Sequence, residues 1–200
     1  MAEANAAAEA DPSVLRVSID SKATVTVGNL SSGGQDRRHQ PPKADDHAMA
    51  WPQGLTPFGM LNLHTDEVAI SLGESAETPD VMVDGLARWW EDHRPKPPKV
   101  TTLAINLDGG RATRSDRTQV IKRMVTLARK TGLTLELIDY PPYHSKDNPI
   151  ERCWAAREQF WNGAILDSVE TTLQWPSTMT WQAMQPVVHH GTDVYEKRLR

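Results

Sequence analysis

The stretch VLRVSID at residues 14–20 alternates apolar with polar side chains and ends on an acid. Its leucine, second valine and isoleucine fall on one face, as in a β-strand that turns one face to a hydrophobic core. The next stretch, ATVTVG at residues 23–28, is rich in β-branched residues and predicts a second strand. We therefore expect the domain to begin with two strands, with Asp20 at the end of the first.

The rest of the chain alternates strand and helix patterns. Further strands are predicted over residues 58–63, 67–72, 100–107 and 133–138, with helices beginning at Thr78-Pro79, Ser115 and Asn148-Pro149. The order β-β-β-α-β-α-β-α, followed by more helices, is that of RNase H-like folds. We predict an α/β protein with an RNase H-like mixed five-stranded sheet flanked by helices, with extra C-terminal helices. Residues 1–12 are predicted to be disordered, 13–200 to form one domain, and 31–52 a long loop within it.

Composition is that of an ordinary globular protein. The 200 residues are 38% hydrophobic. No stretch reaches the roughly 18 apolar residues of a membrane span, and the N-terminus lacks the features of a signal peptide, so we expect a soluble intracellular protein. The single cysteine, Cys153, excludes an internal disulfide and a multi-cysteine zinc site. The net charge of −4 is unfavourable for strong autonomous DNA binding, because phosphate-binding surfaces are usually basic.

Three acids stand where distant segments of such a fold meet. Asp20 and Asp108 each end a predicted strand, and Glu151 lies in the first turn of the helix after the last strand. In an RNase H-like sheet the first and fourth strands are neighbours and the last helix packs across their ends, so we expect the three acids to share one cleft. Mg²⁺ prefers such oxygen ligands, and two ions about 3.5–4 Å apart stabilise the attacking and leaving oxygens of a phosphoryl displacement. Metal binding also relieves the mutual repulsion of the carboxylates.

Each acid also has a purely structural interpretation. Aspartates at strand ends commonly form turns. Asn148, Pro149 and Glu151 fit the N-cap, the first-turn proline and the glutamate of a capping box. Taken one at a time, these local patterns favour turns and capping, whereas the three acids together favour a metal site. The adjacent histidines at residues 189–190 lack the neighbouring cysteines and acids of a zinc site.

A longer motif connects these acids to one family. The run YPPYHSKDNPIER at residues 140–152 closely resembles the last-glutamate motif of DDE transposases from bacterial insertion sequences, in the mariner-like group and most of all the Rhodopirellula-type transposase DDE domain. IDSKA at residues 19–23 resembles the first-aspartate strand of that family, and INLDGG at residues 105–110 resembles the second. The similarity covers nearly all of the chain after residue 14.

The resemblance implies an RNase H-like fold and metal-dependent DNA transposition. Asp20, Asp108 and Glu151 would be the catalytic residues and the ligands of two Mg²⁺ or Mn²⁺ ions. The implied reaction is cleavage of a phosphodiester at the element end by water, followed by attack of the freed 3′-hydroxyl on target DNA. The implied partners are the DNA of the element ends, the target DNA and at least a second copy of the chain. The implied location is the nucleoid in the bacterial cytoplasm. The candidate DNA contacts are Lys22, His144, Lys146 and Arg152.

Two departures from the family pattern bear on activity. Gly109-Gly110-Arg111 follow Asp108 where the family has Asn and a Pro-Glu-Asn-like continuation, which removes polar groups able to orient a ligand. No helix-turn-helix region precedes residue 14, so we expect a truncated transposase. Two alternatives stay open: an RNase H-like nuclease that cuts without joining, and an inactive remnant that serves at most as a DNA-binding or interaction module.

Overall fold

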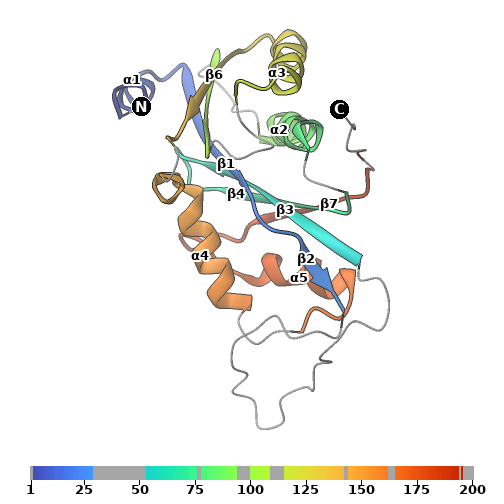
Figure 1. The fold of residues 1–200 in the computed structure, drawn as a ribbon. Coiled ribbons are helices and arrows are strands. Elements are labelled where there is room, and N and C mark those ends of the chain that lie inside the picture. The colour runs from blue at the N-terminus through green and yellow to red at the C-terminus, as the bar shows by residue number, and fades with distance from the viewer. Residues whose placement is uncertain are drawn as a thin grey trace.

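The computed structural model describes residues 2–28, 53–75, 78–93, 100–108, 115–141, 144–161, 165–193 and 195. Its strands are β1 (Val14–Ser21), β2 (Val25–Val27), β3 (Gln53–Asn62), β4 (Val68–Gly73), β5 (Thr102–Leu107), β6 (Thr134–Asp139) and β7 (Val187–Gly191). Its helices are α1 (Ala2–Ala10), α2 (Pro79–His93), α3 (Thr118–Thr131), α4 (Ile150–Trp161), α5 (Val169–Thr178) and the short 3-10 helix η1 (Ser145–Asp147). The strands lie between two groups of helices (Figure 1).

The strands form one mixed sheet in the order β6-β5-β1-β3-β4-β7, and β2 pairs with β3. β1, β3 and β4 are antiparallel neighbours. β5 runs parallel to β1, and β6 runs parallel to β5 after the crossover through α3. The predicted mixed α/β class is confirmed, and so is the pairing of the strand that carries Asp20 with the strand that leads to Asp108, here β1 with β5.

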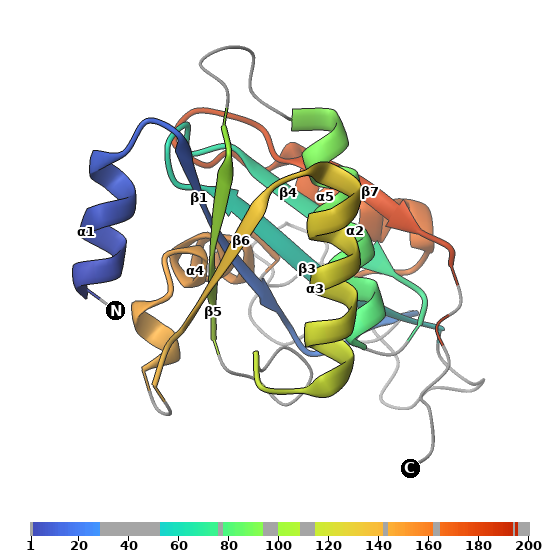
Figure 2. The ribbon, with the colours of Figure 1, turned by 90° about the horizontal axis from the view of Figure 1, so that it is seen from above.

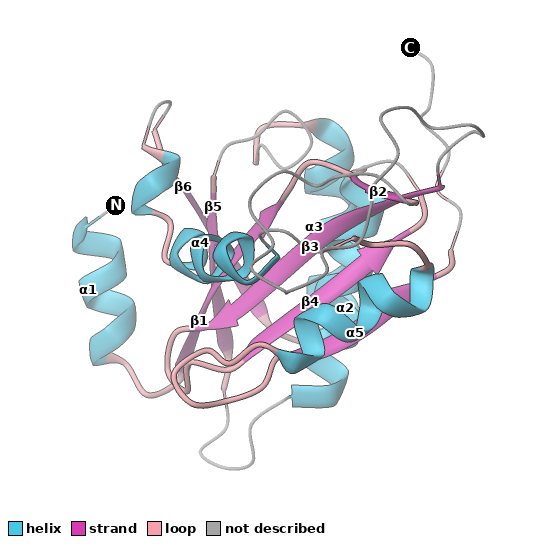
Figure 3. Ribbon diagram, turned by 90° about the horizontal axis from the view of Figure 1, so that it is seen from below, coloured by secondary structure: helices cyan, strands magenta, loops and turns pink. Residues whose placement is uncertain are grey.

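Two hydrophobic cores lie on the two faces of the sheet. α2 and α3 cover one face (Figure 2), and α4 and α5 cover the other (Figure 3). Since successive strand residues point to opposite faces, every second residue of β1 and β5 enters the core under α2 and α3. The strand residues of that core include Leu15, Val17, Ile19, Leu103, Ile105 and Leu107. The core under α4 and α5 includes Leu61, Ile70, Ile150, Cys153 and Trp154.

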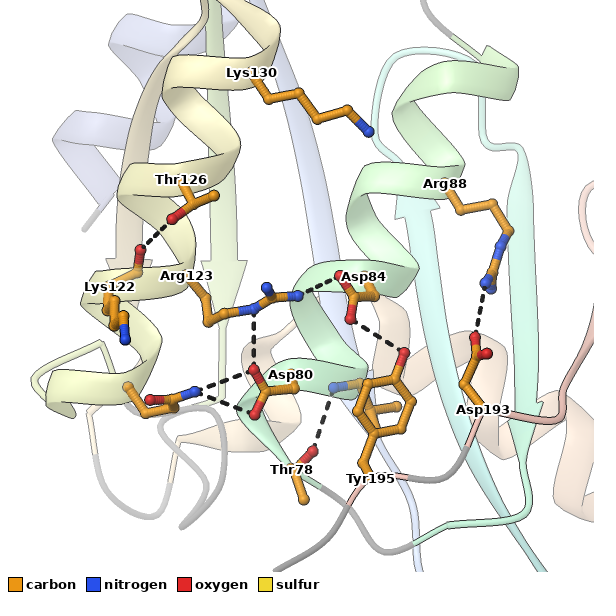
Figure 4. A network of polar contacts seen from close by, with 12 residues as sticks. Thr78, Asp80, Asp84, Arg88, Lys122, Arg123, Thr126, Lys130, Asp193 and Tyr195 are labelled. Atoms are coloured by element: carbon orange, nitrogen blue, oxygen red, sulfur yellow. Dashed lines mark hydrogen bonds and ion pairs between the residues drawn. The ribbon is translucent and has the colours of Figure 1, made fainter. Parts of the chain in front are cut away.

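Charged side chains join α2 to α3 (Figure 4). Arg123 of α3 pairs with both Asp80 and Asp84 of α2, and its Nε lies 3.0 Å from the Asp80 carboxylate. Gln119 donates to the two Asp80 oxygens at 3.1 and 3.2 Å, and the Tyr195 hydroxyl donates to Asp84 at 3.1 Å. Without the arginine, two like charges would lie one helical turn apart, so these contacts stabilise the helix pair.

Three predictions about the ends of the chain and the size of the sheet are wrong. Residues 1–12, predicted to be disordered, contain α1, which is rich in the strong helix former alanine and packs Ala8 against Ala104 and Ile138. The C-terminal part of the chain, predicted to add extra helices, contains α5 but also β7. β7 pairs with the edge of β4 that would otherwise be unpaired. The sheet has seven strands where five were predicted.

Two further expectations concern residues that the structure does not describe. The predicted loop at residues 31–52 lies outside the described residues, and so does the departure at Gly109-Gly110-Arg111. In the part of the chain that is described, no helix combines the length and the apolar character needed to cross a membrane.

Candidate active site

The strand pairing brings Asp20 and Asp108 to one end of the sheet. In β1, Ser18 and Asp20 alternate with the apolar residues of the first core, so both face α4. Ser18 lies opposite Asn106 in the parallel pairing of β1 with β5. Asp20 and Asp108 are each two residues further along, so these acids reach the same end and the same face of neighbouring strands. Asp20 is buried, with only 1% of its side chain exposed.

A buried polar clamp fixes the start of α4 on β1. The Ser18 hydroxyl donates to the side-chain oxygen of Asn148 and accepts from the backbone N–H of Ile150 at 3.0 Å. The Asn148 amide nitrogen donates to the backbone oxygen of Ile19 at 3.1 Å. Both polar side chains are fully buried, so the clamp is shielded from water. It holds Glu151, the residue after Ile150, close to the end of β1.

The ammonium of Lys22 bridges two of the three acids. Lys22 directly follows β1, and its Nζ lies 2.6 Å from Glu151 Oε2 and 3.0 Å from Asp20 Oδ2. The contact with Glu151 is a hydrogen bond. Glu151 therefore directs this oxygen toward β1, not back toward the first turn of its own helix as a capping box requires. The contact between Lys22 and Asp20 is an ion pair.

The electrostatics link all three acids. Burial raises the pKa of Asp20 to about 7; Lys22 opposes this shift, and the negative charges of Asp108 and Glu151 add to it. Asp108 is therefore near enough for its charge to act on Asp20. Burial lowers the pKa of Lys22, but its contacts with Glu151 and Asp20 outweigh that effect, so the pKa is raised overall. Lys22 thus stays positively charged between acids that repel one another.

The donor chemistry of this site fits a divalent cation. The donors are carboxylate oxygens, which suit Mg²⁺ and Mn²⁺. Asp20 Oδ2 is buried, and the Lys22 ammonium 3.0 Å away stands where a cation could bind. Among the described residues, no three acidic, histidine or cysteine side chains already converge as a complete ligand set. Asp20 and Glu151 instead converge on the ammonium of Lys22.

The other predicted DNA contacts lie on the surface around the start of α4. His144 is exposed, and its Nδ1 lies 3.0 Å from an oxygen of Asp147. Lys146 in η1 and Arg152 in α4 are also exposed. Of the four predicted DNA contacts, Lys22 contacts Asp20 and Glu151, whereas His144, Lys146 and Arg152 lie on the exposed surface.

Gly59 allows α4 to approach the sheet beside Asp20. It is the β3 residue paired with Asp20 in the antiparallel register of β1 and β3. A Cβ atom at this position would lie 2.5 Å from the Trp154 ring and 2.9 Å from Ile150. Both residues belong to α4, so the missing side chain of Gly59 sets how closely the helix that carries Glu151 packs. The sequence pattern alone does not reveal this contact, because Gly59 falls inside an ordinary strand pattern.

We expect Gly59→Ala to destabilise the protein by about 1–3 kcal/mol, because the added methyl group forces α4 outward. Urea-induced unfolding at equilibrium measures the effect. The matched control is Gly73→Ala in β4, where a Cβ would meet only the Thr56 carbonyl oxygen at 3.9 Å. If both variants lose the same stability, the close packing of α4 on Gly59 has no energetic role.

The surroundings of Cys153 and His190 indicate structural roles for both residues. Burial, with a smaller effect of the charge of Asp66, raises the pKa of the Cys153 thiol to about 12, so it stays protonated near neutral pH. This agrees with a packing role next to Trp154 in the second core. His190 lies in β7, with its Nε2 2.8 Å from Glu74.

Comparison with known proteins concerns the family and the fold of the chain. The sequence model of the family described as the Rhodopirellula transposase DDE domain matches residues 2–200. No curated protein matches the chain closely enough to count as a relative.

Two similar solved structures are complexes of the Mos1 transposase. One is the paired-end complex with the left transposon end, with a TM-score of 0.51 and 13% identity over 81% of this chain. The other is the Mos1 mariner paired-end complex with Mn, with a TM-score of 0.53 and 14% identity over 80% of this chain. The aligned part spans 46% of the Mos1 chain in each case. At this identity the similarity concerns the fold, and it confirms the predicted RNase H-like class.

Proposed function

Because the chain belongs to the Rhodopirellula transposase DDE domain family, we propose that it is the catalytic domain of a metal-dependent DNA transposase. In this proposal it cleaves phosphodiester bonds at the ends of an insertion sequence and joins the freed 3′ ends to target DNA. The observation that carries the proposal is the meeting of Asp20 and Glu151 at one cation, with Asp108 near enough to raise the pKa of Asp20.

The three carboxylates have separate supports in this proposal. Asp20 is held by β1, between its neighbours β3 and β5, and Asp108 follows directly after β5. Glu151 is held by the buried clamp of Ser18 and Asn148. Together they would hold two Mg²⁺ or Mn²⁺ ions, whose charge, when bound, stabilises the attacking and leaving oxygens of the phosphoryl displacement. Rigid supports suit this role, because such catalysis depends on positioning and electrostatic stabilisation.

The exposed basic residues near α4 are the proposed contacts to DNA. Lys146 and Arg152 would contact backbone phosphates, which attract cationic side chains without regard to sequence, and His144 would donate a hydrogen bond to them. The similar Mos1 structures are paired-end complexes. We therefore include the element ends, the target DNA and a second copy of this chain among the proposed partners, and place the reaction at bacterial chromosomal DNA.

The test is nicking of supercoiled plasmid by the purified chain with Mn²⁺ or Mg²⁺, and joining of a labelled oligonucleotide with a free 3′-hydroxyl to that plasmid. We expect metal-dependent nicking and joining, both reduced at least about a hundredfold by Asp108→Asn and Glu151→Gln. Glu170→Gln, which neutralises an exposed acid in the first turn of α5, is the control that should stay active.

The outcomes separate the competing functions. Nicking without joined product would identify a nuclease that shares the fold. If nicking is absent, or is equally strong in the Asp108 and Glu151 variants, the chain is not an autonomous catalyst at this site. In that case its remaining role would be that of a DNA-binding or interaction module.

A further inference from the structure

Lys22 places a positive charge between two of the three acids of the site. Its Nζ is 2.6 Å from Glu151 Oε2 and 3.0 Å from Asp20 Oδ2, so one ammonium contacts an oxygen of each acid. The backbone of Lys22 is fixed, because its N–H donates to the Pro57 carbonyl oxygen of β3 at 3.0 Å. Its side chain is 23% exposed, so the ammonium has a route to solvent while the main chain stays in place.

We propose that Lys22 is a built-in counter-cation of the metal-free site, which a divalent ion must displace in order to bind. This inference rests on the proposed function, since it assumes that Asp20 and Glu151 are metal ligands. An ammonium and a divalent ion would compete for the same two carboxylate oxygens. They also repel each other at short range, so both cannot occupy the space between Asp20 and Glu151.

The chemistry of lysine suits this role. Lysine carries a compact charge on a flexible four-carbon stem, so it can neutralise the carboxylates and still swing away without rearrangement of the backbone. In the metal-free state it reduces the repulsion among Asp20, Asp108 and Glu151. Once displaced, its ammonium is released beside the site, where a DNA phosphate would be the natural new partner.

The direct test is a Mn²⁺ titration in which electron paramagnetic resonance reports the free ion. The proteins are wild type, Lys22→Met, Lys22→Arg and Asp20→Asn. Methionine keeps most of the length of lysine but not its charge, so we expect Lys22→Met to bind Mn²⁺ on the order of tenfold more tightly. Lys22→Arg retains the competing cation and should not bind more tightly than wild type. Lys122→Met, which removes the same charge from an exposed position of α3, is the matched control and should bind like wild type.

Thermal unfolding gives a second readout that does not depend on catalysis. Without metal, Lys22→Met should melt at a lower temperature than wild type, because the acids lose their counter-cation. With saturating Mn²⁺ its melting temperature should rise by more than that of wild type, because bound metal replaces the missing charge. This comparison also shows whether the variant is folded before its affinity is interpreted.

The outcomes distinguish failure of this inference from failure of the proposed function. If Asp20→Asn weakens Mn²⁺ binding but Lys22→Met leaves it unchanged or weaker, the acids bind metal and the counter-cation role of Lys22 is wrong. If no protein binds Mn²⁺, or Asp20→Asn binds as well as wild type, the metal site itself is wrong, and the inference falls with it.

Discussion

Replacing Asp20 with asparagine is expected to make the metal-free protein more stable while abolishing its activity. The Asp20 side chain is 1% exposed, and burial raises its pKa to about 7 although the Lys22 ammonium opposes this shift. Keeping this carboxylate ionised in the folded state therefore opposes folding. Asparagine has nearly the same shape without the charge, so at pH 8 the free energy of unfolding should rise by about 2 kcal/mol.

The pH dependence of this effect has a definite sign. Below about pH 4 the carboxyl group is protonated in both states and contributes nothing. Between pH 4 and 7 the unfolded chain releases a proton that the folded protein retains, so the stability of the wild type falls as pH rises. Above pH 7 the loss is complete. The stability advantage of Asp20→Asn should therefore be small near pH 4, grow up to pH 7 and then level off.

Urea unfolding with EDTA at pH 5, 6, 7 and 8 measures this difference. Other titrating groups are shared by wild type and variant, so the difference between the two curves isolates Asp20. Asp92→Asn, at an exposed position of α2, is the control and should show no such trend. The prediction fails if Asp20→Asn is less stable than wild type at pH 8, or if its advantage does not depend on pH.

The expected gain in stability explains why the loss of activity is informative. A variant that is more stable than wild type cannot be inactive because it is unfolded. Its loss of nicking and its loss of Mn²⁺-induced stabilisation would both report on the missing carboxylate. Functional sites commonly retain such destabilising groups because the chemistry requires them.

The meeting of the acids could be predicted because it depends on strand order and alternation. The alternating pattern of residues 14–20 predicts which face Asp20 occupies, and the order of elements predicts that the strand ending at Asp108 is its neighbour. The position of Glu151 follows from the helix that begins after Pro149. Each of these features is local or topological, so a single sequence contains the information needed.

The contacts that complete the site depend on side chains meeting in three dimensions. The sequence places Lys22 beside Asp20 but does not show that its ammonium reaches Glu151, which is 129 residues away. In the sequence, Ser18 is an ordinary polar residue of a strand. Its contacts to Asn148 and Ile150 depend on how α4 packs against β1, which the sequence pattern does not give. The strand β7 could not be predicted for the same reason. Its hydrogen bonds are made with β4, which is distant in the sequence.

Asn148→Ala is expected to lower the free energy of unfolding by about 2–3 kcal/mol, because it leaves buried polar groups of β1 without partners. Asn148 accepts from the Ser18 hydroxyl and donates to the Ile19 carbonyl oxygen, and it is fully buried. Urea unfolding measures this loss. Since the same contacts hold the start of α4, nicking by the folded fraction should fall on the order of a hundredfold, as expected when a catalytic group shifts by about 1 Å.

The matched control removes an ordinary helix cap away from the acids. Ser168 caps α5 by accepting from the Thr171 N–H at 3.1 Å, and Ser168→Ala should cost about 1 kcal/mol. Its nicking rate per folded molecule should remain that of wild type, because α5 carries none of the three acids. If Asn148→Ala loses stability but nicks as fast as Ser168→Ala when both are corrected for the folded fraction, the clamp stabilises the fold without positioning Glu151. A selective loss in Asn148→Ala would instead show that buried hydrogen bonds between β1 and α4 hold Glu151 in its working position.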